Sequence, residues 1–175
     1  FFRNRDRLPL PDEDTEFSMY LLCSELLTKN GYQKYEISNF AKAGMESRHN
    51  LRYWRRQDYL GFGVAAHSCF RGERFGNSRD LNAFLRREDI TAERCTLTPS
   101  DELYEYLILG LRLAEGISEE EFTRRFGCSF EEFYPRVREL IRQGYLKKAE
   151  GRISFTDSGF FVSNAILSDL PDLSE

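Results

Sequence analysis

Apolar and polar residues follow a helical period in the first part of the chain. Asp12 can cap a helix and Gly31 can end one, and the positions between them that share one face are Phe17, Tyr20, Leu21, Ser24 and Leu27. Residues 32–40 then predict a strand, with Tyr35 and Ile37 on one face. A helix followed at once by a strand favours one αβ step of a parallel sheet.

The middle of the chain carries weaker patterns. Residues 44–57 have no clean period and predict a loop with one helical turn. A short strand over residues 59–62 leads into a glycine-punctuated segment, and residues 69–77 predict a hairpin that turns at Arg71–Gly72. Residues 80–87 predict a short helix.

The second half of the chain has stronger helix signals. A helix is expected from Thr98–Pro99 to Gly116. Two capping boxes predict two further helices, Ser118 with Glu121 and Ser129 with Glu132. The second of these helices should reach Gly144 with a kink at Pro135, a hairpin should turn at Glu150–Gly151, and a final helix should follow it.

The order helix, short helix, helix, hairpin, helix is that of a winged helix-turn-helix module. We therefore divide the chain into an N-terminal region of residues 1–90 and a winged-helix-like domain of residues 91–175. The mixture of helices and strands predicts the α/β (α+β) fold class.

Composition narrows the class of protein. The chain has 175 residues, of which 41% are hydrophobic and 31% charged, which excludes disordered, collagen-like and small disulfide-rich proteins. Its apolar runs are too short to span a membrane and no export leader is visible, so we expect a cytoplasmic protein. The cysteines at positions 23, 69, 95 and 128 are too far apart for a metal-binding pair, and we expect free, buried thiols.

Charge is unevenly distributed along the chain. The net charge of −4 divides into −2 for residues 1–40, +6 for residues 41–87 and −8 for residues 88–175. A basic middle between acidic flanks favours an anionic ligand or partner, and an ordinary arginine-rich surface is the alternative.

His49 lies in the most unusual part of the basic segment. Asn50, Tyr53 and Trp54 follow it closely, and four arginines are interleaved with them: Arg48, Arg52, Arg55 and Arg56. A flat, dianionic, iron-containing ligand would use this mixture, because rings stack, guanidinium groups hold carboxylates and imidazole binds iron. Nucleic acid and a buried Tyr–Trp pair with solvated arginines are the alternatives.

Small residues in the next segment let backbone approach a ligand closely. Gly61, Gly63, Ala65 and the second histidine, His67, lie within seven residues. The pattern is not a dinucleotide-binding fingerprint, because no helix start or distal acidic residue follows it, and tight packing is the alternative.

The winged module raises the question of DNA binding. Its candidate recognition helix, residues 130–143, carries Arg136, Arg138 and Arg142. The −8 balance of this half would repel phosphates, so we expect no nucleic-acid partner and favour a role as a lid or protein contact.

Three runs together resemble one known family. They are Tyr35–Ala41, His49–Trp54 and Asp58–Ser68, flanked by Leu8–Asp12 and by Glu139–Leu146. The chain resembles the oxygen-independent coproporphyrinogen III oxidase family of radical SAM proteins over nearly its whole length. The resemblance implies an incomplete (β/α) barrel followed by a helical C-terminal domain.

The family's cofactors are implied for a longer parent protein. Its members hold a [4Fe-4S] cluster on a CxxxCxxC triplet and bind S-adenosyl-L-methionine (SAM) at the cluster. This chain has no such triplet and begins at Phe1, so we expect the end of the barrel plus the C-terminal domain, without radical SAM activity of its own.

The motif H-N-x-x-Y-W, matched by His49, Asn50, Tyr53 and Trp54, resembles the HemW branch of the family. That branch implies heme binding and transfer to an acceptor protein. On this basis we expect His49 to be the iron ligand and Tyr53 and Trp54 to stack on the ligand. The candidate propionate partners are Arg48, Arg52, Arg55 and Arg56. The same resemblance makes Gly61–Ser68 a segment facing SAM and the porphyrin. Oxidative decarboxylation of coproporphyrinogen III is the enzymatic alternative, and an exposed sheet edge would favour a homodimer.

Overall fold

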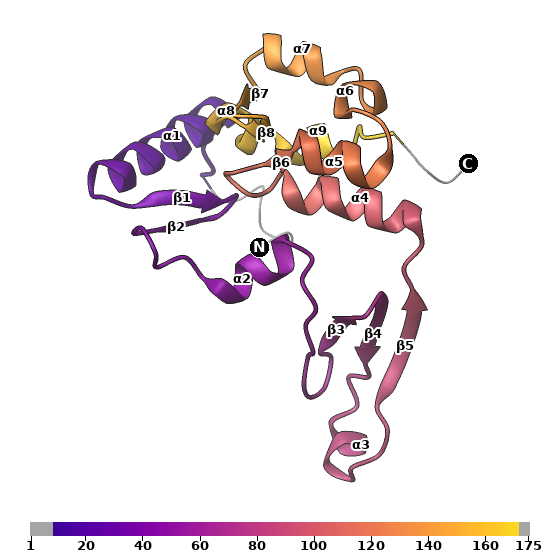
Figure 1. Cartoon of the computed structure of the whole chain (residues 1–175). Helices are drawn as coiled ribbons and strands as arrows, with labels where there is room; N and C mark the ends of the chain where they lie inside the picture. Colours follow the sequence, from indigo (N-terminus) through magenta and orange to yellow (C-terminus); the bar gives the residue numbers. More distant parts are fainter. Residues whose placement is uncertain (1–8, 172–175) are drawn as a thin grey trace.

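A computed structural model describes residues 9–171 of the chain. Figure 1 shows a compact C-terminal part and an arm that extends away from it. We call residues 59–96 the arm and residues 97–171 the C-terminal module. Leu8, at the predicted start of the family resemblance, and the outer ends of both predicted domains lie outside the described residues.

The first helix, α1 (Glu13–Lys29), forms as predicted. The Asp12 carboxylate accepts a hydrogen bond from the backbone N–H of Thr15 at 2.8 Å, which satisfies one of the free N–H groups of the first turn. The strand predicted over residues 32–40 is wrong as a single element. It is a hairpin of β1 (Gln33–Glu36) and β2 (Asn39–Ala41), because the chain turns after Glu36.

Every strand pair in residues 9–171 is antiparallel, so the expected αβ step of a parallel sheet is wrong. The end of a (β/α) barrel, which the family resemblance implied, would need parallel strands, and the described residues contain no parallel strand pair. The α+β class is confirmed: helices pack with small antiparallel sheets.

Residues 44–57 contain a longer helix than expected, α2 (Arg48–Trp54). Ser47 caps it, accepting a hydrogen bond from the backbone N–H of Asn50 at 3.3 Å. A helix of two turns is too short to show a clear hydrophobic period, which explains why the sequence pattern predicted mostly loop. Helix α2 lies beside the C-terminal module, between β2 and the arm (Figure 1).

The arm is a three-stranded antiparallel sheet with a short helix at its tip. Its elements are β3 (His67–Phe70), β4 (Glu73–Asn77), α3 (Leu81–Leu85) and β5 (Thr91–Thr96), and the strand order is β3-β4-β5. The turn predicted at Arg71–Gly72 is confirmed, and both residues have positive φ, 52° and 79°, as a tight two-residue hairpin turn requires. The strand predicted over residues 59–62 is reduced to one bridge between Tyr59 and Cys69.

The C-terminal module follows the predicted order of elements. They are α4 (Pro99–Gly110), β6 (Ile117–Ser118), α5 (Glu119–Phe126), α6 (Phe130–Phe133), α7 (Val137–Arg142), β7 (Leu146–Ala149), β8 (Arg152–Phe155), α8 (Asp157–Phe161) and α9 (Ser163–Leu167). Strand β8 lies between β6 and β7, and the β7–β8 hairpin turns at Glu150–Gly151 as predicted. The order is that of a winged helix-turn-helix, with β7 and β8 as the wing.

Three helices of this module are shorter than expected. Helix α4 ends at Gly110 rather than near Gly116. The helix predicted over residues 130–143 is interrupted around Pro135, because proline has no N–H to continue the helical ladder. The last helix is divided into α8 and α9 at Val162.

One hydrophobic core lies inside the C-terminal module. Phe122 is fully buried, and its ring lies within 6 Å of those of Phe126, Phe130 and Phe133. Buried residues of this cluster come from α4 through the segment after α9. Burial of large aromatic side chains dominates core energetics, so this cluster is what holds the module together.

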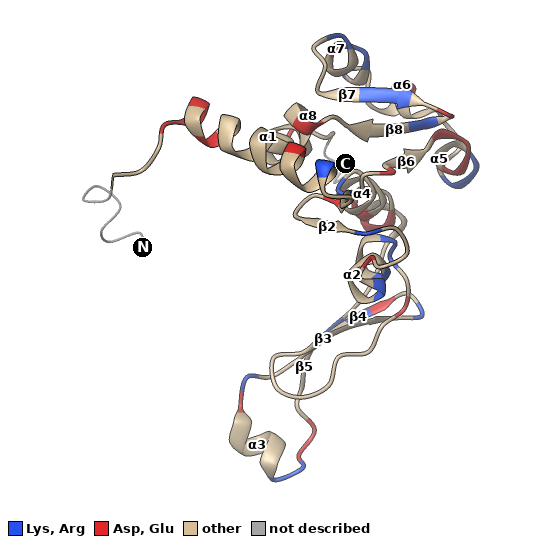
Figure 2. Ribbon diagram, turned by 90° about the vertical axis from the view of Figure 1, so that its left-hand side faces the viewer, with Lys and Arg blue, Asp and Glu red and all other residues tan. Residues whose placement is uncertain are grey.

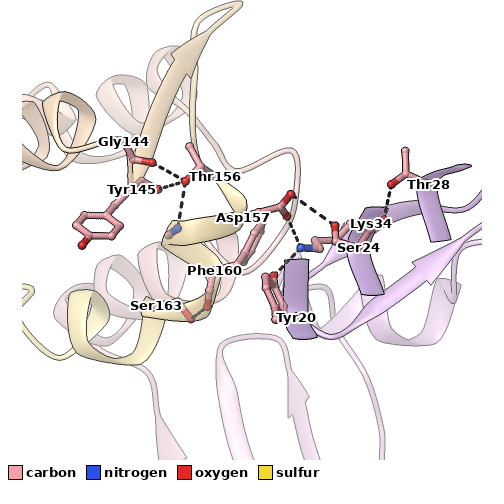
Figure 3. Close-up of polar contacts among 11 residues, drawn as sticks. Tyr20, Ser24, Thr28, Lys34, Gly144, Tyr145, Thr156, Asp157, Phe160 and Ser163 are labelled. Carbon is pink, nitrogen blue, oxygen red and sulfur yellow. Dashed lines mark hydrogen bonds and ion pairs between the residues drawn. The ribbon is translucent and has the colours of Figure 1, made fainter. Parts of the chain in front are cut away.

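A polar junction ties the N-terminal elements to the module (Figure 3). Lys34 of β1 extends its ammonium to within 2.5 Å of both the Asp157 carboxylate of α8 and the Tyr20 hydroxyl of α1. The rings of Tyr20, Phe40 and Phe160 lie 4.5 to 5.3 Å from the same nitrogen. Because aromatic faces attract cations, one lysine joins segments more than 120 residues apart.

The cysteines are free, as predicted, but the expectation that they are buried is wrong. Cys23 and Cys95 are exposed and the other two are half-buried. Within residues 9–171, no helix combines the length and the apolar character needed to cross a bilayer.

Candidate functional site

Helix α2 arranges the predicted heme-binding residues on adjacent faces. His49 is exposed, and its ring meets that of Tyr53 edge-on at 4.7 Å between centroids. Tyr53 in turn contacts the ring of Tyr59 edge-on at 4.4 Å. The His49 imidazole therefore packs on one side against the Tyr53 ring, and its exposed side is accessible to a ligand.

Two arginines flank His49 on the neighbouring face of α2. Arg48 and Arg52 are four residues apart, which places them on one side of a helix, and both are exposed. The Nη1 group of Arg52 donates to the backbone carbonyl of Asp58 at 3.0 Å. Neither arginine forms an ion pair with another residue of the described part of the chain, so both remain open to a carboxylate.

The other two arginines of the motif segment are already paired. Arg55 lies 3.2 Å from the Glu115 carboxylate, and Arg56 lies 3.2 Å from that of Glu105. Of the four arginines predicted as propionate partners, Arg55 and Arg56 therefore have ion pairs within the described residues, and Arg48 and Arg52 have none.

Trp54 turns towards the C-terminal module rather than towards His49. The guanidinium carbon of Arg112 lies 5.9 Å from the centre of its indole ring. Asn50, the other polar residue of the motif, is half-buried and donates its backbone N–H to the Ser47 cap. His49 and Tyr53 thus lie on the open face of α2, while Trp54 lies on the face against the module.

Glu105 is a residue that the sequence did not single out. Its carboxylate holds Arg56 at 3.2 Å and Arg74 of β4 at 2.5 Å, so it connects α4 with both α2 and the arm. Its partners lie 49 and 31 positions away in the sequence, and no local pattern predicts such a link. Burial raises the pKa of Tyr59 and that of the Cys69 thiol beside this cluster, which keeps both groups neutral near pH 7.

The glycine-punctuated segment is built for close packing. A Cβ at Gly61 would lie 2.3 Å from the backbone oxygen of His67, so no larger residue fits there. Gly63 and Ala65 have positive φ, 93° and 56°, and the His67 ring lies over Gly76, whose added Cβ would be 3.0 Å from Nδ1. The small residues of this segment thus allow close packing between parts of the arm itself.

The structure separates this segment from α2. Gly61 and Gly63 line a cavity of about 550 Å³ with Phe62 and Phe84, and Ala65 and His67 line another of about 270 Å³. No residue of α2 lines either cavity. The predicted heme-binding and cofactor-binding residues therefore form two distinct surfaces of the described chain.

The donor set for an iron–sulfur cluster does not fit this chain. The four cysteines lie far apart in sequence, and residues 9–171 contain no group of three His, Cys, Asp or Glu side chains arranged to hold a metal ion. A heme needs only one axial side chain from the protein, which the exposed His49 can supply.

The arginines of the predicted recognition helix are engaged within the protein. Arg136 pairs with Asp169, Arg138 with Glu131 and Arg142 with Glu139. Figure 2 shows both basic and acidic residues on this module. A phosphate backbone would have to displace these carboxylates from the arginines, and the absence of a nucleic-acid partner stays a prediction.

Comparison with protein families identifies the C-terminal module. Residues 97–162 match the model of the HemN C-terminal domain. The C-terminal module is a HemN C-terminal domain. The family resemblance predicted from the sequence is thereby confirmed, and the match begins directly after β5.

Curated relatives extend the similarity to at least 90% of the chain. The heme chaperone HemW of Lactococcus lactis is 38% identical over 94% of this chain, and that of Bacillus subtilis is 34% identical over 93%. HemW of Escherichia coli is 32% identical over 90%. The chain spans less than half the length of these relatives, 45%, 44% and 43%.

A solved structure shares the fold. Coproporphyrinogen III oxidase (HemN) from Escherichia coli, a radical SAM enzyme, superposes with a TM-score of 0.69 over 95% of this chain and 43% of its own. At 18% identity, this likeness shows the fold alone. It places the arm, α2 and the HemN C-terminal domain in one known arrangement.

Proposed function

We propose that this chain supplies the heme-binding surface of a HemW-type heme chaperone, with His49 as the axial ligand of the iron. The observation that carries the proposal is the open face of α2, where an exposed imidazole stands against Tyr53 beside two arginines free of ion pairs with described residues. The curated relatives carry the name heme chaperone, which supports the same reading.

Each group on this face has a role that follows from its chemistry. A neutral imidazole coordinates heme iron through the lone pair of a ring nitrogen. The edge-on contact with the Tyr53 ring orients the His49 imidazole for this role. Arg48 and Arg52 offer guanidinium forks, which bind carboxylates such as heme propionates in a bidentate manner. Heme is the cargo here, so the site has to release it as well as bind it.

An exposed ligand suits transfer. Because His49 lies on the surface of a short helix, an acceptor protein can approach the opposite face of the heme while the imidazole still holds the iron. We also propose that the acceptor is a cytoplasmic protein or one reached from the cytoplasm. The open edge strand β5, exposed along its whole length, is where a second copy of the chain would pair.

We propose a separate role for Gly61, Gly63, Ala65 and His67. In the longer parent protein this segment would face SAM and its [4Fe-4S] cluster, whose ligands this chain does not contain. Oxidative decarboxylation of coproporphyrinogen III has only the fold likeness in its favour, so we favour heme transfer over it.

Titration of the 175-residue chain with hemin tests the proposal. The wild-type chain should give a shifted Soret band, because imidazole ligation changes the heme spectrum. His49→Ala should abolish that shift and weaken binding about tenfold or more, the scale of one lost strong contact. His67→Ala, the change of the other histidine, should leave the shift intact; a His49→Ala spectrum equal to wild type would overturn the proposal.

A further inference from the structure

A third cavity lies on the other side of α2, against the HemN C-terminal domain. It has a volume of about 300 Å³, and its walls include Trp54, Arg56, Tyr106 of α4, Arg125 of α5 and Arg152 of β8. None of the C-terminal residues in this wall belongs to the heme motif. The cavity is therefore formed by Trp54 of the heme motif together with a domain for which the sequence suggested no ligand.

The cavity wall carries more positive than negative charge. Its four arginines face two carboxylates, those of Glu115 and Glu121. Arg55 lies 3.2 Å from the Glu115 carboxylate, and Arg125 lies 2.8 Å from that of Glu121. Arg56 lies 3.2 Å from Glu105 of α4, outside the wall, which leaves Arg152 as the wall arginine without a carboxylate partner among the described residues. One guanidinium group in excess in a recess favours an anion.

Two of these arginines keep donors free. Arg152 uses Nε and Nη2 on the carbonyls of Glu115 and Gly116, each at 2.8 Å, and its Nη1 makes no hydrogen bond with a described residue. Arg125 binds Glu121 through Nη2, and its guanidinium carbon lies 5.3 Å from the centre of the Tyr106 ring. Both groups are thus held in place while N–H groups remain for a carboxylate, the partner that a guanidinium fork fits best.

Helix geometry places this cavity around α2 from the proposed iron site. Successive residues of an α-helix are about 100° apart, so Trp54 is about 100° from Tyr53 and about 140° from His49. A carboxylate of a ligand held at His49 would reach the cavity around the side of α2, past Trp54, which lines the cavity wall. The volume is at the lower end of that of ligand pockets, which suits one side chain of a large ligand rather than a macrocycle.

We propose that this cavity receives a propionate carboxylate of the tetrapyrrole, with Arg125 and Arg152 as its partners. The inference rests on the proposed heme-binding function and adds a subsite to it. In this arrangement the HemN C-terminal domain contacts the tetrapyrrole directly. Trp54 is then the residue that connects the iron site on α2 with the carboxylate subsite.

The test compares hemin with hemin dimethyl ester, in which both carboxylates are blocked. Binding to the 175-residue chain is followed through quenching of Trp54, the chain's single tryptophan. Arg125→Gln and Arg152→Gln should each weaken hemin binding about tenfold, the effect of one charge-assisted hydrogen bond, and should leave binding of the ester unchanged. Arg124→Gln is the matched control, because Arg124 is an exposed neighbour on α5 outside the cavity wall.

The outcomes separate the two proposals. If the wild-type chain binds hemin through His49 and neither variant weakens it, or if hemin and its ester are weakened alike, the carboxylate subsite is overturned and the heme-binding function stands. If the wild-type chain binds no hemin, both are overturned. Arg125 is largely exposed, so its variant should fold, and circular dichroism of all variants checks this.

Discussion

The HemN C-terminal domain and the arm are stabilised in different ways. The C-terminal domain surrounds a continuous core in which Phe122 and Phe130 have no exposed surface. Between residues 59 and 96 the buried residues are Ser68 and Gly76, while Phe62 is 87% and Leu85 68% exposed. The arm therefore depends on its strand ladder and on the ion pair between Arg74 and Glu105 of α4, and its apolar side chains form an exposed surface.

This difference explains where the two candidate surfaces lie. Helix α2 has no buried residue of its own, but it rests on the C-terminal domain, which gives the proposed heme site a rigid base. The segment around Gly61 and Gly63 lies on the arm, with no comparable core beneath it. Sites on rigid elements hold geometry better than sites on loops, so a ligand on α2 is positioned more firmly than one on the arm.

Truncating one large ring in each region should give the largest difference in stability between the C-terminal domain and the arm. Phe122→Ala should lower the free energy of unfolding by about 3–5 kcal/mol, because it empties the centre of the core. Phe84→Ala, on the exposed helix α3, should cost less than about 1 kcal/mol. Urea unfolding followed by circular dichroism measures both, and equal losses would contradict the comparison.

Removing the ammonium at the Lys34 junction should have the next largest effect. Lys34→Met should cost about 1–3 kcal/mol, since a hydrogen-bonded charge with a side chain only 9% exposed is lost. The Asp157 carboxylate is 48% exposed and regains water, which limits the loss. Lys29→Met removes an exposed pair with Glu25 and should change stability by about 0.5 kcal/mol or less. If the Lys34 variant is as stable as the Lys29 variant, the Lys34 junction does not contribute to stability.

The parts of the fold that were predictable from sequence are those set by local interactions. The Ser129–Glu132 capping box forms with both of its hydrogen bonds, because its partners are three residues apart. The Arg71–Gly72 turn was predictable for the same reason. The Lys34–Asp157 pair was not, since it joins positions 123 residues apart and depends on how α1 packs against α8.

The candidate site shows the same limit. The motif histidine and its arginines are neighbours in the sequence, so their association on α2 could be expected. Which arginines remain free depends on carboxylates far along the chain, such as Glu105 and Glu115. The wall of the cavity beside Trp54 likewise combines residues from α2, α4, α5 and β8. Packing of distant elements, not local pattern, creates these features.

Breaking the Glu105 link should loosen the arm without unfolding the C-terminal domain. Glu105→Gln weakens the ion pairs with Arg56 and Arg74 and should cost about 1 kcal/mol, because the three charges are partly buried. Hydrogen exchange of β4 amides should speed up, while amides of α5 should exchange as before. Glu102→Gln, an exposed change on the same helix, is the control, and equal protection of β4 in both variants would argue against the link.

A last effect, a pH dependence inside the C-terminal domain, is expected only at alkaline pH. Burial, together with the hydrogen bond that the Tyr134 hydroxyl donates to Asp169 at 3.0 Å, raises the pKa of Tyr134 to about 12. The folded chain therefore keeps this proton at a pH where the unfolded chain, with a tyrosine pKa near 10, releases it. The stabilising contribution is complete below about pH 10 and is lost as the pH rises towards 12.

Tyr134→Phe tests that contribution, because phenylalanine has no proton to lose. Its free energy of unfolding should fall less steeply than that of the wild type between about pH 10 and pH 12, measured by urea unfolding at several pH values. Tyr104→Phe, at an exposed tyrosine of α4, should retain the wild-type slope. If the Tyr134 and Tyr104 variants have the same slope, the buried hydroxyl does not couple the core of the C-terminal domain to pH, and that core differs from the arm in apolar packing alone.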